Sequence, residues 1–179
     1  MKNKIHFSYL FLLCTCVIWA VSATAAEVNS RYVTLQYDNK RVLHEFNNKL
    51  IVGKKLSSMM RKKNVDTVVD EVLAKADVIV EKTQVVLDMF PDKIHVTLVV
   101  LGDEDDVAAK YKERYGKEQA NIAFYSLSAR TIYISADDTN LRVLAHEMGH
   151  AVTDQYFKVR PPYKIHELMA QFAEKHITD

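Results

Sequence analysis

The spacing of apolar and polar residues changes several times along the chain, and each change marks an expected element. Residues 31–37 alternate and are rich in β-branched and aromatic side chains, so they predict a strand. The β-branched run at 94–101 predicts a second, buried strand. Apolar residues recur at helical spacing over 65–89, which predicts a long amphipathic helix with Asn64 or Asp66 as its N-cap.

The segments around these elements are shorter. Residues 39–62 are ambiguous but mostly helical, with a break near Gly53. Asp103 can cap a helix that continues to about Tyr115 and ends at Gly116, because glycine readily adopts the left-handed conformation that closes a helix. Helices therefore alternate with strands in this part of the chain.

The last third of the chain begins with two β-rich runs, at 122–125 and 131–135, which are separated by a short polar link and predict a hairpin. A helix is expected over about 140–157, and after Pro161-Pro162 a last helix is expected over 163–177. Together these elements predict an α+β fold in which a small mixed β-sheet packs on long helices.

The beginning of the chain differs in composition from the remaining residues. Its positively charged start leads into an almost unbroken apolar run at 7–21 and then into the small residues at 23–25. This layout is typical of a secretory signal peptide, so we expect residues 1–25 to be removed and the protein to be secreted or periplasmic. Residues 26–179 would then form a single domain without stable membrane insertion. The alternative is an uncleaved anchor, because the apolar run approaches the length that spans a bilayer.

Composition narrows the chemistry expected of this domain. Cys14 and Cys16 are the only cysteines, and both lie in the expected signal peptide, so neither a disulfide nor a thiolate metal ligand is expected afterwards. Any metal would be held by histidine, aspartate or glutamate. The 24 lysine and arginine residues nearly balance the 23 aspartate and glutamate residues, which gives no reason to expect a nucleic acid as partner.

Candidate chemistry is concentrated in the run His146-Glu147-Met148-Gly149-His150. Two histidines four residues apart project from the same side of a helix and can reach one metal ion, about 2 Å from each ring nitrogen. Glu147 can act as a general base without being a ligand. Gly149 costs a helix up to about 1 kcal/mol relative to alanine, which indicates close approach by another backbone or a ligand. The competing interpretation is a core helix with two exposed histidines.

The flanks of this run favour a partly buried helix. One broad face would carry Val143 and the polar residues His146, Glu147, His150 and Asp154. The other side is apolar and can pack into a core, with Leu141, Leu144, Ala145, Met148 and Val152.

A catalytic zinc site needs a third protein ligand, and the downstream candidates are Asp154, His166, Glu167, Glu174 and His176. Asp154 is one turn beyond His150 on the same helix and suits a supporting position around the ligands better than a ligand position. On the last helix we favour Glu167, because the small Ala170 beside it allows close approach of another helix, and Glu174 is the competitor. The opposite face of that helix would then lie in the core, with Ile165, Leu168, Met169, Phe172 and His176.

These pieces resemble the gluzincin metallopeptidases, in which an HExxH helix is followed by a helix that supplies a glutamate ligand. Residues 146–154 are similar to the thermolysin-like run His-Glu-Leu-Thr-His-Ala-Val-Thr-Asp. Residues 166–170 resemble the ligand motif Asn-Glu-x-x-Ala/Ser, and 123–125 resemble the edge strand that binds the substrate backbone. The resemblance covers about residues 121–176.

The resemblance implies a zincin-like fold and a secreted zinc-dependent peptidase. The Zn²⁺ cofactor would be bound by His146, His150 and Glu167, while Glu147 would take a proton from the attacking water as catalytic base. A peptide or protein substrate would lie main chain to main chain along the edge strand, at Ala123, Phe124 and Tyr125.

Several residues depart from the family pattern. Gln171 stands where the family has an aspartate that orients the first histidine, so we expect it to accept a hydrogen bond from that imidazole without a charge. His166 replaces the family's asparagine before the glutamate ligand. The family's larger C-terminal subdomain, which supplies an oxyanion-stabilising histidine, has no counterpart here. Tyr156, Tyr163 and His176 are the possible donors to an oxyanion.

Two other functions remain open at this stage. The same metal site could serve an aminopeptidase or an amidase of cell-wall peptides, although no specific acidic site for a substrate amine is found. A catalytically inactive or self-blocked zinc-binding domain could instead act in binding. Glu147 argues against that function, because a structural site needs no base, whereas Gln171 argues for it. The oligomeric state is not indicated by any pattern.

Overall fold

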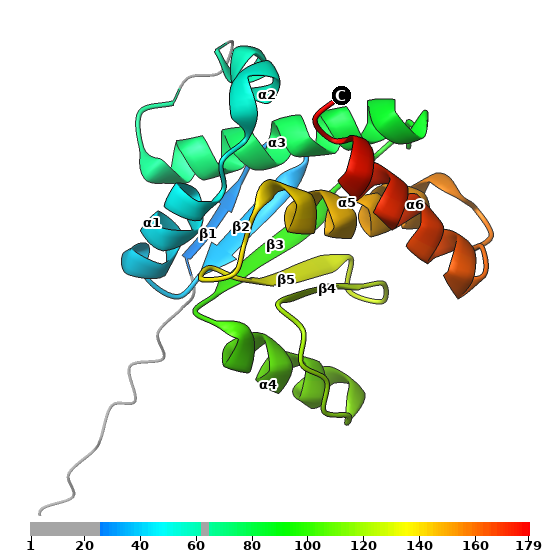
Figure 1. The fold of residues 1–179 in the computed structure, drawn as a ribbon. Coiled ribbons are helices and arrows are strands. Elements are labelled where there is room, and N and C mark those ends of the chain that lie inside the picture. The colour runs from blue at the N-terminus through cyan, green and yellow to red at the C-terminus, as the bar shows by residue number, and fades with distance from the viewer. Residues whose placement is uncertain (1–25, 62–64) are drawn as a thin grey trace, which may run out of the picture.

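The computed structural model describes residues 26–61 and 65–179 (Figure 1). Within these residues the protein has six helices and one five-stranded mixed sheet, which confirms the expected α+β class. The expected signal peptide at 1–25 and the candidate cap Asn64 lie outside the described residues. Among the described helices, none combines the length and the apolar character needed to cross a bilayer.

The sheet has the strand order β1-β2-β3-β5-β4. Its strands are β1 (Ala26–Asn29), β2 (Val33–Tyr37), β3 (Val96–Leu101), β4 (Ala123–Ser126) and β5 (Thr131–Ser135). The three central strands are parallel, whereas β1 and β4 run antiparallel to their neighbours at the two edges. The expected hairpin is therefore present, and its first strand is an edge strand.

Strand β1 was not expected from the sequence. Residues 26–29 are mostly exposed, and only one side of the strand is paired, to β2. A short edge strand of this kind carries little hydrophobic alternation, because neither of its faces is fully buried. By contrast, the alternating Val33, Leu35 and Tyr37 of β2 are all buried, which is the pattern that predicted that strand.

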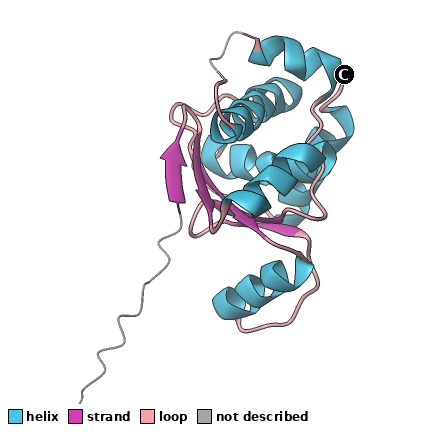
Figure 2. Ribbon diagram, turned by 90° about the vertical axis from the view of Figure 1, so that its left-hand side faces the viewer, coloured by secondary structure: helices cyan, strands magenta, loops and turns pink. Residues whose placement is uncertain are grey.

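The helices are α1 (Lys40–Lys49), α2 (Gly53–Met60), α3 (Val68–Leu87), α4 (Glu104–Tyr115), α5 (Leu141–Tyr156) and α6 (Tyr163–His176). The ambiguous stretch at 39–62 is thus two helices, and the break near Gly53 is real. Five helices gather on one side of the sheet, whereas α4 covers the other side at the β5–β4 end (Figures 1 and 2). The main core lies between the five helices and the sheet, and a smaller cluster of Val107, Phe124 and Tyr133 lies under α4.

Helix α3 begins later than expected, and its cap is Thr67 rather than Asp66. The Thr67 side chain accepts a hydrogen bond from the backbone of Asp70, and the Asp70 carboxylate accepts one from the backbone of Thr67. This reciprocal pair satisfies two backbone donors at once, which a single aspartate before it cannot do. The expected ends of α4, at Asp103 and Gly116, are both confirmed.

Helix α5 buries the side that the sequence assigned to the core: Leu141, Leu144, Ala145, Met148 and Val152 are all buried. The prediction for α6 was wrong for most of the face assigned to the core, although the partly buried Met169 does pack against the core. Ile165, Leu168 and Phe172, expected in the core, are 42%, 56% and 47% exposed, whereas Ala170 and Ala173 are fully buried.

The close packing of α5 against α6 explains this reversal. An added Cβ at Gly149 would lie 2.8 Å from Cα of Ala170 and 3.1 Å from Cβ of Ala173, so the two helices meet through their smallest residues. Helices that approach this closely bury small side chains between them and leave larger ones outside. The predicted close approach at Gly149 is therefore confirmed, and it fixes which face of α6 turns toward the histidines.

Candidate metal centre

Three potential metal ligands converge from two helices. His146 and His150 project from α5 and Glu167 projects from α6, and one ligand atom from each lies within 4.8 Å of the other two. Nε2 of His146 is 3.6 Å from Oε1 of Glu167, and Nε2 of His150 is 3.7 Å from Oε2 of the same carboxylate. Among the described residues this is the only group of three or more such side chains with that geometry.

These separations fit ligands of one cation better than hydrogen bonds. Both exceed the usual hydrogen-bond distance of about 3 Å. Two ligands of a tetrahedral ion with bonds of about 2.1 Å stand roughly 3.4 Å apart, close to the observed values. The group formed by His146, His150 and Glu167 can therefore hold a metal ion.

A carboxylate behind His146 fixes the direction of its ring. Nδ1 of His146 lies 2.9 Å from Oε2 of Glu174, so Nε2 is the nitrogen that faces Glu167. A hydrogen bond of this kind selects the tautomer that leaves the other nitrogen free for a metal. Gln171, expected in this position, instead donates from Nε2 to Oε1 of Glu167 at 3.0 Å. The expected partner was one turn too early on α6.

Glu147 lies beside the cluster and is buried, with 8% of its surface exposed. Burial raises the pKa of its carboxyl to about 8; a backbone hydrogen bond from Tyr125 opposes the shift, and the charges of Glu167 and Glu174 add to it. A cation among the imidazoles would stabilise the ionised form and lower that pKa again. Glu147 is thus placed to exchange a proton near neutral pH.

His150 is held in its neutral form. Burial lowers its pKa to about 4, and the neighbouring His146 acts in the same direction, whereas Glu167 opposes them. A neutral imidazole has a free lone pair, which is the form that binds metal. The electrostatics of the cluster therefore favour coordination at neutral pH.

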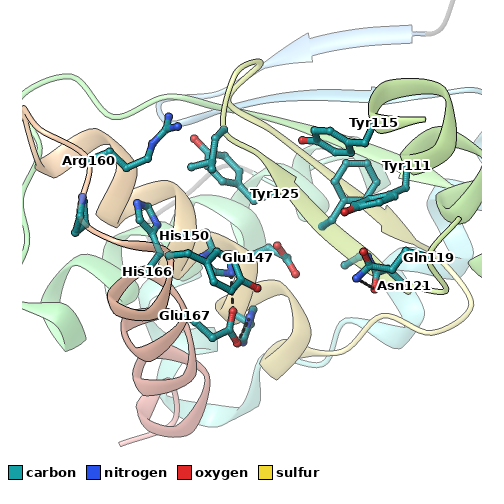
Figure 3. Close-up of a pocket in the computed structure, with 16 residues that line it drawn as sticks. Tyr111, Tyr115, Gln119, Asn121, Tyr125, Glu147, His150, Arg160, His166 and Glu167 are labelled. Carbon is teal, nitrogen blue, oxygen red and sulfur yellow. Dashed lines mark hydrogen bonds and ion pairs between the residues drawn. The ribbon is translucent and has the colours of Figure 1, made fainter. Parts of the chain in front are cut away.

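The cluster lies in a cleft of about 360 Å³ (Figure 3). Its lining residues are Tyr111, Tyr115, Gln119, Asn121, Ala123, Phe124, Tyr125, Leu127, His146, Glu147, His150, Arg160, Pro161, Tyr163, His166 and Glu167. The expected substrate-binding residues Ala123, Phe124 and Tyr125 all belong to this lining and to the edge strand β4. The structure thus brings the edge strand and the metal cluster to the same cleft.

Asp154 does not support a ligand histidine as expected. Its carboxylate accepts a hydrogen bond from the Tyr125 hydroxyl at 3.2 Å and contacts from Nε and Nη2 of Arg160 at 3.2 and 3.0 Å. Burial, together with the charge of Asp154, raises the pKa of Tyr125, so the hydroxyl stays protonated. Asp154 therefore links the edge strand to the loop before α6.

Of the three suggested oxyanion donors, only Tyr163 lines the cleft. Tyr156 packs edge-on against Phe157, and His176 packs on Phe172 at the far end of α6. Tyr163 differs from the other two because it is the first residue of α6, and this end of the helix borders the cleft.

Two features of the cleft were missed or undervalued in the sequence. One wall comes from α4 and the loop after it, through Tyr111, Tyr115, Gln119 and Asn121, and no local pattern connects that segment to the histidines. The other is His166, which the sequence offered only as one of five candidates for the third ligand. It is 3% exposed, and its ring stacks on that of His150 with centroids 6.0 Å apart.

Comparisons of the chain with protein-family models, with curated proteins and with solved structures found no match. The resemblance to gluzincins over about residues 121–176 therefore stays a prediction. What the structure contributes is the arrangement of α5, α6 and β4 around one cleft and a group of three side chains that can hold a metal ion.

Proposed function

We propose that this protein is a secreted zinc-dependent peptidase of the gluzincin type. The observation that carries the proposal is the convergence of His146, His150 and Glu167 beside the buried carboxylate of Glu147, in a cleft bordered by an edge strand. A site that only stored metal or stabilised the fold would have no use for a base at that place or for an open cleft. Secretion rests on the composition of residues 1–25.

Zinc is the metal that best suits these donors. Two imidazoles and one carboxylate form the ligand set of a well-known class of catalytic zinc sites. When bound, the metal would supply Lewis acidity toward a carbonyl oxygen and make a water molecule more acidic. His146 and His150 would bind through Nε2, the nitrogen that faces Glu167 in each ring.

Proton transfer would fall to Glu147. Its carboxylate would accept a proton from the attacking water and then give it to the departing amine, so that the same group serves as base and acid. Burial at this position excludes bulk solvent and favours the protonated state between the two transfers.

Substrate positioning would fall to β4. This strand pairs with β5 on one side only. Within the described residues its other edge can therefore accept a peptide, except at the Tyr125 N–H, which donates to Glu147. An extended substrate can add to such an edge through main-chain hydrogen bonds, antiparallel to Ala123–Ser126. Binding through the backbone would place a scissile carbonyl next to the metal cluster without dictating the side chains.

The first test combines metal analysis with peptide hydrolysis. The purified protein should contain about one zinc per chain and hydrolyse casein. A chelator should abolish the activity, because both the polarisation of the carbonyl and the acidity of the water depend on the metal. Glu147→Gln should keep zinc but lose at least about 100-fold in rate, since the base is lost while the ligands remain. Glu113→Gln, an exposed glutamate on α4, is the matched control and should change neither.

The outcomes separate the candidate functions. Zinc binding without hydrolysis of any peptide would favour the inactive, binding domain. Hydrolysis confined to substrates with a free N-terminus would favour an aminopeptidase, and cleavage of cell-wall peptides alone would favour an amidase. Full activity in Glu147→Gln would contradict the assigned base.

A further inference from the structure

The imidazole of His166 lies in the wall of the cleft without a polar partner among the described residues. Neither Nδ1 nor Nε2 has a hydrogen bond, although the residue is only 3% exposed and borders the cleft beside His150. Leaving a buried polar group unsatisfied costs about 1–3 kcal/mol, so such groups are rare and often await a ligand. The geometry of the metal cluster does not use this ring.

Arg160 stands at the same end of the cleft as His166. Figure 3 shows both on the side of the cleft formed by α6 and the loop before it, opposite Tyr111 and Tyr115. Nε and Nη2 of Arg160 are held by Asp154, which leaves Nη1 without a hydrogen bond within the described part of the chain. Asp154 accepts hydrogen bonds from Tyr125 and Arg160, so it orients the guanidinium and offsets part of its charge.

The backbone at this end of the cleft also favours a negative charge. Helix α6 starts at Tyr163 with Pro162 as its N-cap, no side chain caps it, and its first turn holds no acidic residue. The N–H groups of Ile165 and His166 donate to the Pro162 carbonyl, and what remains at this helix end to attract an anion is the helix dipole with the N–H groups before Ile165. Pro161 and Tyr163 line the cleft, so this helix end is part of the wall.

From these three features we infer that the end of the cleft formed by Arg160, His166 and the start of α6 binds a carboxylate of the substrate. This deepens the proposed peptidase function and rests on it for the identity of the ligand as a peptide. A guanidinium with a free N–H edge and a neutral imidazole are both donors that match carboxylate oxygens.

The carboxylate has two possible sources. It could be the side chain of an aspartate or glutamate, or the C-terminal carboxylate of the peptide. In an antiparallel complex with β4, the substrate runs from the Ser126 end toward the Ala123 end. Arg160 is tied through Asp154 to Tyr125, near the Ser126 end. That direction favours an acidic side chain on the N-terminal side of the scissile bond.

The test measures binding so that it does not depend on hydrolysis. Zinc-loaded Glu147→Gln would be titrated with fluorescently labelled peptides that differ only by glutamate or glutamine at one position on either side of the centre. Each peptide would be made with a free and with an amidated C-terminus. We expect the peptide with glutamate on the N-terminal side to bind about tenfold more tightly than its glutamine partner, whatever its C-terminus, as for a charge-assisted hydrogen bond.

Substitutions in the same zinc-loaded Glu147→Gln protein would show which residues cause the preference for glutamate over glutamine. Adding Arg160→Gln should bring the ratio of the two affinities close to one while leaving the glutamine peptide unchanged. His166→Phe keeps a ring to stack on His150 but removes both nitrogens, and should reduce the ratio partially. Lys158→Gln removes the same charge from the same loop outside the cleft lining and should leave the ratio unchanged. Melting curves and zinc content would verify that each variant is folded and loaded.

Several results would overturn the inference. These are equal affinities of all the peptides, whatever their side chain and C-terminus, binding of no peptide, or a preference that survives Arg160→Gln. Equal affinities within each glutamate–glutamine pair, with weaker binding of the amidated peptides than of the free ones, would assign the carboxylate to the C-terminus and reverse the inferred peptide direction while keeping the carboxylate site. A preference in the binding assay without hydrolysis by the unmodified protein would refute the peptidase and keep the site. Hydrolysis without any preference would do the opposite.

Discussion

The two ring nitrogens of His146 face different carboxylates at the candidate metal centre. Nε2 of His146 faces Glu167, and Nδ1 is bound by Glu174, one turn beyond Gln171 along α6. Glu174, considered from sequence as a competing ligand, thus contacts the side of the ring away from the proposed metal. A charged partner there makes the ring a stronger electron donor than the neutral Gln171 could.

At this scale we predict that Glu174→Gln weakens zinc binding about 10- to 100-fold, because the imidazole loses the anion that orients and polarises it. Competition with a chelating dye would measure the zinc dissociation constant. Glu113→Gln is again the control, since its carboxylate pairs with Lys110 on the surface of α4. An unchanged dissociation constant in Glu174→Gln would show that the contact is incidental.

At the scale of elements, the site depends on the distance between two helices. Gly149 and the alanines of α6 let the helix axes approach until Glu167 reaches both histidines. The lost helix propensity of glycine, about 1 kcal/mol, is therefore offset by packing. Small changes at this contact should affect stability and metal binding together.

We predict that Gly149→Ala destabilises the protein by about 1–3 kcal/mol despite the better helix propensity of alanine, because the new methyl group meets the Ala170 backbone. Chemical denaturation would measure the free energy of unfolding. Gly102→Ala is the matched control: its Cβ would also meet an atom at 2.8 Å, but that atom is Oδ2 of the flexible Asp106 side chain, so the cost should be smaller. A stabilised Gly149→Ala would contradict the close packing of α5 on α6.

A second element-scale prediction concerns pH. The Lys75 ammonium on α3 is buried and contacts Asn47 and, at 3.0 Å, Glu71. Partial burial raises the pKa of Glu71, but hydrogen bonds from Lys75 and Asn47 outweigh it, so the net shift is below the ordinary value of 4.5. The folded state therefore binds a proton more weakly than the unfolded state, and this contribution to stability is present above pH 4.5 and lost as pH falls further.

Melting temperatures of the wild-type protein and of Glu71→Gln, measured between about pH 3 and 7, would test this pH dependence, because the Glu71 carboxyl titrates within that range. Glu71→Gln should lose roughly 1 kcal/mol or less at neutral pH, because the pair is partly exposed, and should show a flatter decline in acid. An equally steep decline in the variant would assign the acid sensitivity to other carboxylates.

On the scale of the whole molecule, the proposed metal would join two helices that carry different parts of the fold. Helix α5 lies on the sheet and in the main core, whereas α6 packs mainly on α5 and α3. A ligand that binds only the folded arrangement stabilises it by mass action, about 2.7 kcal/mol at 100 times its dissociation constant. Metal should therefore protect the fold as well as enable chemistry.

We predict that saturating zinc raises the melting temperature of metal-free protein by roughly 5–10 °C. This range follows because each kcal/mol of stabilisation raises the melting temperature of a domain of this size by a few degrees. Scanning fluorimetry with and without chelator would measure it. His150→Ala removes one ligand and should abolish the shift, whereas Glu147→Gln should retain it. The same shift in His150→Ala would mean that zinc binds elsewhere.

Sequence periodicity predicted the elements well and the burial of α6 poorly. Helix α5 was recognised because large apolar side chains and two histidines repeat at helical spacing over four turns. In α6 the same reasoning chose Phe172 and its neighbours for the core, but the buried residues are mainly alanines. Hydrophobicity ranks residues by size and polarity, whereas a close helix contact selects small ones.

Residue order alone determined that His146, Glu147 and His150 lie along one side of one helix, because spacing along an α-helix converts directly into direction. It also determined the mixed class of the fold and the hairpin near its end. Only the tertiary structure decided that Glu167 meets the histidines, that Glu174 supports one of them from behind, and that Arg160 and His166 share the end of the cleft. Those relations depend on the depth and angle of packing between helices, which are set by contacts far apart in the chain and leave no local period.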